Sequence, residues 1–302
     1  MKVRPLKAEK LSPKLSYSNK QSIARPGGVL LYSRDMFDQL IHRWLRVPYS
    51  LHTVVKKNSK TGPTILFIHG IGNSGKVWDE VIAQLPDGVR TVTVDLLGFG
   101  KSPRPAWITY NAKTQARSVL ATYLKLRLRG RVLVVGHSLG SLVAVELARR
   151  YPLLVRGLIL CSPPFYHLED GERQLLPKPE KVLRSIYKVL KNHPDEFLKV
   201  AGLALRYRLI TEAFDVTKDS VGAYMATLEA AIINQTAMRD VQKLNLPIDI
   251  LHGLFDPVVI GQNLVWLAKT RPNIKLHHIA SGHDISGPMI SATVKAVNNS
   301  LN

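Results

Sequence analysis

A strand–turn–helix pattern centred on Ser138 constrains the fold of this chain more than any other part of its sequence. Residues 131–135 (RVLVV) are mostly apolar and rich in valine, which predicts a short buried strand. Residues 141–150 (SLVAVELARR) have helical apolar spacing and end in two arginines, which predicts a helix. The intervening GHSLG must turn sharply, and the glycines two positions before and after the serine make room for that turn. Such a turn lifts the serine hydroxyl above the end of a sheet, beside backbone N–H groups that can stabilise an oxyanion.

Short apolar strands alternate with helices on both sides of this pattern. The expected strands are residues 51–55, 64–68, 91–94, 132–135, 158–160, 248–251 and 274–279. The expected helices are residues 77–84, 112–128, 141–150, 262–269 and 290–297. This alternation predicts an α/β fold, in which helices cover both faces of a mostly parallel sheet.

The alternation is interrupted between residues 163 and 246, where the sequence is helical in character. The expected helices there are residues 181–190, 195–209 and 220–241. An insertion of this kind between two strands predicts a helical cap over the carboxyl end of the sheet, where ligands bind in open α/β sheets. The domain prediction is therefore a core of residues 34–162 and 247–302, a cap of residues 163–246, and a basic, flexible arm of residues 1–33.

The charge of the chain is strongly basic and concentrated near the N-terminus. The net charge is +20, and residues 1–60 hold 13 Lys and Arg against 3 Asp and Glu. A solvated tail is the favoured interpretation, and an arm that touches anionic membrane surfaces, nucleic acid or acidic partners is the alternative. No nucleic-acid-binding motif is present, so no nucleic-acid partner is expected. Residues 35–45 have helical apolar spacing and are expected to pack on the core or cap an active-site mouth rather than lie on a membrane.

The single cysteine, Cys161, excludes an internal disulfide and favours a reducing compartment. The basic N-terminus lacks the apolar segment of a secretory signal, and no apolar run approaches the roughly 18 residues that span a bilayer. A cytoplasmic location is the resulting expectation. No His, Cys and carboxylate cluster has the spacing of a metal site, so we expect neither a metal nor another cofactor. The sequence leaves the oligomeric state open.

A serine nucleophile at this turn needs a histidine base and an acid that orients the base, in the chain order serine, acid, histidine. Asp256, in GLFDPVV, follows one expected strand, and His283, in SGHD, follows the last one. Parallel strands bring their carboxyl ends to one edge of a sheet, so both residues should approach Ser138. His277 and His278 are weaker candidates for the base because they fall within a strand.

Backbone N–H groups for an oxyanion hole are expected from two residues. Ile71 lies in HGIG at the end of another expected strand, and its flanking glycines let its backbone turn inward. Leu139 directly follows the serine, at the start of the expected helix. Since both residues would donate through the backbone, their side chains are free to vary.

Together with DLLGFGKS at residues 95–102, these motifs resemble the α/β-hydrolase superfamily, in its cap-bearing serine esterase and lipase-like branch. The resemblance covers residue 63 to the C-terminus. It implies that Ser138 is the nucleophile, that His283 acts as general base and then as acid, and that Asp256 is the orienting carboxylate. It also implies the hydrolysis of small-molecule carboxylic esters through an acyl-enzyme intermediate. Related dehalogenases and epoxide hydrolases carry an aspartate at the turn, so the serine argues against both.

Three alternative functions stay open at this point. The same triad could serve carbon–carbon bond hydrolysis or perhydrolysis. The basic N-terminal arm could make the chain a membrane-associated lipase or lysophospholipase. A member without catalysis could use the pocket only to bind a ligand, although the complete triad argues against that alternative.

Overall fold

The chain divides into two units, Met1–Arg46 and Val47–Asn302. The structure, a computed structural model, describes residues 37–166 and 216–301. The predicted arm of residues 1–33 and the predicted helices at 181–190 and 195–209 lie outside these residues. In the first unit the described residues form one short helix of the π type, η1 (Gln39–Trp44), and none of its residues is buried.

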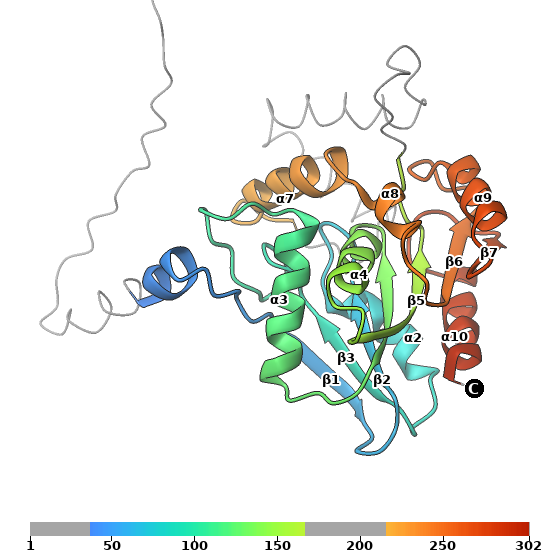
Figure 1. Ribbon diagram of the computed structural model, residues 1–302, viewed down its shortest axis with the longest axis horizontal. Coiled ribbons are helices and arrows are strands. Elements are labelled where there is room, and N and C mark those ends of the chain that lie inside the picture. The colour runs from blue at the N-terminus through green and yellow to red at the C-terminus, as the bar shows by residue number, and fades with distance from the viewer. Residues whose placement is uncertain (1–36, 167–215, 302) are drawn as a thin grey trace, which may run out of the picture. The chain divides into compact units, whose positions relative to one another are not determined.

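The second unit is built on a seven-stranded sheet with the order β1-β3-β2-β4-β5-β6-β7 (Figure 1). All neighbouring strands are parallel except the edge strand β1, which runs antiparallel to β3. The strands are β1 (Thr53–Asn58), β2 (Thr64–Ile68), β3 (Arg90–Val94), β4 (Val132–His137), β5 (Val155–Cys161), β6 (Ile248–Gly253) and β7 (Ile274–Ile279). The predicted α/β fold is confirmed.

Helices cover both faces of this sheet. The helical segments are η2 (Gly75–Trp78), α2 (Asp79–Ala83), α3 (Ala112–Lys125), α4 (Leu139–Arg150), α7 (Val221–Thr227), η3 (Leu228–Ile233), α8 (Ala237–Val241), α9 (Gly261–Thr270) and α10 (Pro288–Leu301). Figure 1 shows α3 and α4 on one face and α2 and α10 on the other. The helices of the first face share a hydrophobic core with α7, η3, α8 and α9, and α2 and α10 share a second core.

The strand β2 illustrates why a sheet covered on both faces needs continuous apolar strands. Its side chains alternate between the two cores: Leu66 and Ile68 join the core of α3 and α4, while Ile65 and Phe67 join that of α2 and α10. Every residue of β2 and β4 is buried. A polar side chain in either strand would therefore be removed from contact with water, whichever face of the sheet it pointed to.

The predicted helix at 220–241 is wrong in its continuity, because the chain forms α7, η3 and α8 with a break between Ile233 and Ala237. The buried Gln235 lies in this break, and its side-chain amide donates hydrogen bonds to the carbonyl groups of Ile232 (3.1 Å) and Pro164 (2.6 Å). The second bond ties the break to the segment that follows β5. A side chain that bonds backbone groups in this way competes with the regular helical pattern.

Within residues 37–166 and 216–301, the structure contains no helix that is long and apolar enough to cross a membrane.

Candidate active site

Ser138 occupies a strained turn between β4 and α4. Its backbone has φ 49° and ψ −116°, a conformation that a residue with a side chain rarely adopts. The Ser138 N–H donates to the carbonyl of Cys161 at the end of β5 (2.9 Å), and the Ser138 carbonyl accepts the N–H of Ser141 (2.9 Å). The turn is thus fixed on one side by the neighbouring strand and on the other by the first turn of α4.

The glycines of GHSLG are required by close backbone contacts. A Cβ atom at Gly136 would lie 2.5 Å from the carbonyl oxygen of Gly140, across the turn. A Cβ atom at Gly140 would lie 2.2 Å from the carbonyl oxygen of Ile68, at the end of β2. Because both contacts are with backbone atoms that cannot move aside, a larger residue at either position would open the turn that presents Ser138.

The three side chains predicted to work together form an unbroken chain of hydrogen bonds. The Nε2 atom of His283 lies 3.0 Å from Ser138 Oγ, and its Nδ1 atom lies 2.7 Å from Asp256 Oδ2. A carboxylate can only accept, so the proton sits on Nδ1 and leaves Nε2 free to accept the serine proton. Asp256 Oδ1 accepts the backbone N–H groups of Val258 (2.8 Å) and Val259 (3.2 Å), which fix the orientation of the carboxylate.

The loops that carry Asp256 and His283 are joined to each other. The N–H of Leu254 donates to the carbonyl of Ile279 (2.8 Å), and that of Phe255 to the carbonyl of Ser281 (3.0 Å). A Cβ atom at Gly253 would lie 2.2 Å from the carbonyl oxygen of Gly282, so the two loops approach as closely as backbones can. Adjacent strand ends, and not long flexible side chains, therefore bring the acid and the base together.

Of the two predicted oxyanion donors, Leu139 directly follows Ser138, and Ile71 follows Gly70, where a Cβ atom would lie 3.3 Å from the Cβ of Ser138. Leu139 begins α4, where the first backbone N–H groups have no acceptor within the helix and carry its positive dipole end. Ile71 follows β2, and within the described parts of the chain its N–H has no hydrogen-bond acceptor. The loop before it is held by His69, which accepts the N–H of Leu96 at Nε2 (2.9 Å) and donates from Nδ1 to the carbonyl of Gly70 (2.6 Å).

The electrostatics of the site favour an ionised Asp256. Its side chain is fully buried, and burial raises its pKa. The hydrogen bond and charge of His283 and the N–H of Val258 outweigh burial, so the pKa lies below the ordinary value for aspartate. The neighbouring carboxyl of Asp284 has the opposite shift, because burial raises its pKa and the charge of Asp256 adds to this effect. Asp256 is therefore the better-suited carboxylate to stabilise a protonated imidazole.

His137, the residue before the serine, is buried against His283. Their ring centroids are 5.1 Å apart, and His137 Nε2 donates to the main-chain carbonyl of His283 (2.8 Å). Its Nδ1 atom is buried and has no hydrogen-bond partner in the described residues. A proton on Nδ1 would be a buried charge without an acceptor, so burial, together with the charge of His283, lowers the pKa of His137 to about 3.

This low pKa predicts a pH-dependent stability. Between about pH 6.5 and about pH 3 the unfolded chain binds a proton at position 137 that the folded chain does not, so stability falls as the pH falls through this range. In His137→Gln the amide can keep the hydrogen bond to His283 but cannot titrate. We expect the slope of the unfolding free energy against pH to decrease by up to about 1.4 kcal/mol per pH unit, measured by urea unfolding between pH 4 and pH 6. An unchanged slope would show that this imidazole is protonated in the folded protein.

The alternative candidates lie elsewhere or have structural partners. His277 in β7 pairs with Asp249 in β6 (2.6 Å) on the protein surface, and His278 contacts His252 (3.4 Å). Asp95, at the start of the DLLGFGKS motif, accepts the backbone N–H groups of Gly75 and Lys101 and so holds its own loop. Burial raises the pKa of the Cys161 thiol to about 12, which keeps it protonated and unreactive.

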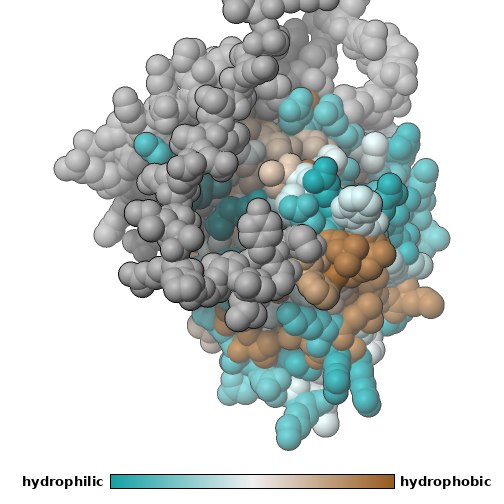
Figure 2. Space-filling model, turned by 90° about the vertical axis from the view of Figure 1, so that its left-hand side faces the viewer, coloured by the Kyte–Doolittle hydropathy of each residue, from teal (hydrophilic) through white to brown (hydrophobic). Residues whose placement is uncertain are grey.

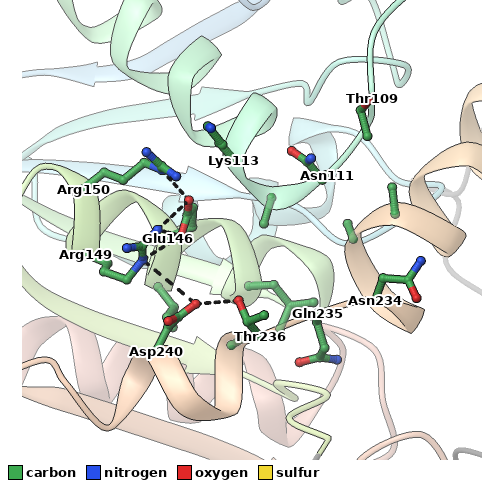
Figure 3. A pocket seen from close by; sticks show the side chains of 16 residues that line it. Thr109, Asn111, Lys113, Glu146, Arg149, Arg150, Asn234, Gln235, Thr236 and Asp240 are labelled. Atoms are coloured by element: carbon green, nitrogen blue, oxygen red, sulfur yellow. Dashed lines mark hydrogen bonds and ion pairs between the residues drawn. The ribbon is translucent and has the colours of Figure 1, made fainter. Parts of the chain in front are cut away.

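A pocket of about 450 Å³ lies between α3, α4, η3 and α8 (Figure 3). None of Ser138, Asp256 and His283 lines it. Its buried Glu146 pairs with Arg149 (2.9 Å) and Arg150, and its Asp240 accepts a hydrogen bond from Thr236 (2.6 Å). Asp240 also lies 3.9 Å from Arg149, so both carboxylates are paired within the protein. Because no residue of the triad lines the pocket, it is separate from the candidate active site. Among the described residues no group of His, Cys, Asp and Glu could hold a metal ion.

Comparisons with known proteins agree with this architecture. Residues 63–198 match the family model described as alpha/beta hydrolase fold. An esterase from Exiguobacterium antarcticum superposes with a TM-score of 0.67 at 19% identity, over 82% of this chain and 95% of the esterase. The chain therefore has the α/β-hydrolase fold, and residues 63–198 carry the sequence match to the family model.

Two curated relatives are similar in sequence over different lengths. The 2-(acetamidomethylene)succinate hydrolase of Mesorhizobium japonicum is 26% identical over 87% of this chain and 95% of its own. "Probable lysophospholipase BODYGUARD 3" of Arabidopsis thaliana is 35% identical over 36% of this chain, and the match spans only 23% of that relative.

The sequence did not reveal the partner of one residue near the site. His137 lies within the GHSLG motif, but the motif does not indicate that its side chain bonds the backbone carbonyl of His283. The two residues are 146 positions apart. The sequence indicates only that both residues lie near the carboxyl ends of parallel strands, β4 and β7, which does not specify a contact.

Proposed function

We propose that this chain is a serine hydrolase that cleaves carboxylic esters through an acyl-enzyme intermediate. The observation that carries the proposal is the hydrogen-bond chain from Ser138 Oγ through His283 to Asp256, with distances of 3.0 and 2.7 Å. An alcohol is a weak nucleophile at neutral pH and needs such a base within hydrogen-bond reach.

In the proposed reaction Ser138 Oγ attacks the ester carbonyl carbon while His283 Nε2 takes the hydroxyl proton. The N–H groups of Ile71 and Leu139 stabilise the negative charge that develops on the carbonyl oxygen. The tetrahedral intermediate then breaks its bond to the alkoxy oxygen, which leaves as an alcohol with the proton from His283. A water molecule, activated by the same imidazole, attacks the acyl-enzyme and releases the carboxylic acid.

The choice of an ester rests on the similar proteins as well as on the site. Esterases from Exiguobacterium antarcticum and Thermogutta terrifontis have the same fold, and a lysophospholipase is named among the partial relatives. These names concern those proteins, and they support a carboxylic ester as the first substrate class to test here. The predicted cap, cytoplasmic location and absence of a cofactor stay predictions.

The proposal is tested with p-nitrophenyl esters of increasing acyl length. We expect turnover that rises to a maximum at one acyl length and then falls, because a pocket of finite size accommodates one length best. The release of p-nitrophenol is followed by absorbance, and a fluorophosphonate probe that labels Ser138, located by peptide mass spectrometry, checks that the nucleophile is accessible.

Labelling of Ser138 without turnover of any ester would contradict the ester assignment. It would favour carbon–carbon bond hydrolysis or perhydrolysis instead. A panel of vinylogous diketones and a peroxide-dependent assay would then separate these two reactions. The absence of both labelling and turnover would favour a protein that only binds a ligand.

A further inference from the structure

Residues 37–45 of the first unit, which include η1, expose a group of large apolar side chains. The exposed fractions of Phe37, Leu40, Trp44 and Leu45 are 63%, 50%, 75% and 66%. In most soluble proteins large apolar residues reach the surface singly, and a contiguous group marks an interaction site. Figure 2 shows one face of the molecule on which hydrophobic residues (brown) gather beside hydrophilic ones (teal).

The exposed apolar residues recur with helical spacing. Counted from Phe37, they lie at positions three, seven and eight, which places them along one side of a helix. Four of the five residues between them are polar, and the fifth, Ile41, is an apolar residue that is partly buried. The polar residues are Asp38, Gln39, His42 and Arg43. His42 lies 3.7 Å from Asp38, four positions earlier, so the polar side has interactions of its own. The segment is therefore amphipathic, and its apolar side is the exposed one.

The charge of the same unit identifies the kind of surface that would cover this side. Residues 1–46 contain ten Lys and Arg and three Asp and Glu, a net charge of +7. An amphipathic helix with exposed Trp, Phe and Leu, in a basic segment, has the properties of helices that lie in the interface of anionic bilayers. Each basic residue near such a surface strengthens binding about five-fold at physiological ionic strength.

We propose that residues 37–45 form an interfacial helix that binds the surface of membranes containing anionic lipids. The apolar side inserts between the acyl chains near the head groups, and the basic residues of the unit contact the lipid phosphates and carboxylates. A second copy of this unit is a poorer partner, because two units of charge +7 repel each other. This proposal departs from the expectation that residues 35–45 pack on the core or cap an active-site mouth.

The test is co-sedimentation of the full chain with phosphatidylcholine vesicles, with and without phosphatidylserine. We expect binding to the anionic vesicles that weakens as salt is added, and a blue shift of tryptophan fluorescence that is lost in Trp44→Phe. Leu45→Glu should weaken the binding at least about ten-fold, because it places a charge where the bound membrane would otherwise bury a leucine side chain. The matched control is Leu153→Glu, since Leu153 is 89% exposed in the second unit.

Equal binding of wild type and Leu45→Glu, equal binding to neutral and anionic vesicles, or no binding at all would overturn the proposal. So would a dimer, measured by analytical ultracentrifugation, that Leu45→Glu dissociates, because the apolar side would then be covered by a second copy. The measurement is repeated in Ser138→Ala so that lipid hydrolysis cannot alter the vesicles. Membrane binding thus succeeds or fails independently of the proposed esterase activity.

Discussion

Ser138→Ala is expected to lower the turnover of the preferred ester at least about 10³-fold while the chain stays folded. The hydroxyl makes a single described side-chain hydrogen bond, to His283 Nε2, so its removal takes away the nucleophile and little else. The backbone bonds that hold the turn, to Cys161 and from Ser141, do not involve the side chain. The measurements are kcat with the best p-nitrophenyl ester and the midpoint of urea unfolding.

The matched control is Ser118→Ala, which deletes another buried hydroxyl, on α3. We expect this variant to retain its turnover within about two-fold, since only a hydroxyl beside the base can attack a substrate. Turnover above a tenth of wild type in Ser138→Ala would contradict the proposed nucleophile. An equal loss in Ser118→Ala would show that buried hydroxyls matter to this fold and not to the chemistry.

The sequence predicted those parts of the fold that depend on the residues of an element itself and on its immediate neighbours in the chain. β2 begins and ends at the predicted residues, 64 and 68, because its side chains must be apolar on both faces of the sheet. α3 begins at the predicted residue, 112, where Asn111 accepts the N–H of Thr114 (2.9 Å) and so caps the helix. The close approach of Ser138, His283 and Asp256 also followed from one rule, because parallel strands end at the same edge.

Features that depend on contacts between distant residues could not be predicted. The break between η3 and α8 depends on Gln235 reaching the carbonyl of Pro164, 71 positions earlier in the chain. Gly253 must be a glycine because the backbone of Gly282 passes within 2.2 Å of its Cβ position. Sequence periodicity indicates whether a residue lies in a helix or a strand and on which face. It does not indicate which distant backbone group will contact that residue.

The second large effect is expected from Asp256→Asn, which should lower kcat about 10³–10⁴-fold. An amide can donate to His283 Nδ1, and the imidazole would then carry its proton on Nε2, where it can no longer accept the serine proton. The asparagine carbonyl can still accept the N–H groups of Val258 and Val259, so the loop should keep its conformation. KM should change little, because the carboxylate is fully buried and does not contact the substrate.

Asp249→Asn is a closely matched control for this prediction. Asp249 also pairs with a histidine of the neighbouring segment, His277, at 2.6 Å, but that pair is on the surface and away from Ser138. If the effect of Asp256→Asn comes from the tautomer of His283, Asp249→Asn should keep its turnover within about two-fold. Similar losses in both variants would mean that aspartate–histidine pairs stabilise β6 and β7 rather than direct a proton. A loss of less than ten-fold in Asp256→Asn, with the fold intact, would require another group to orient His283, and Asp284 is the nearest carboxylate in the sequence.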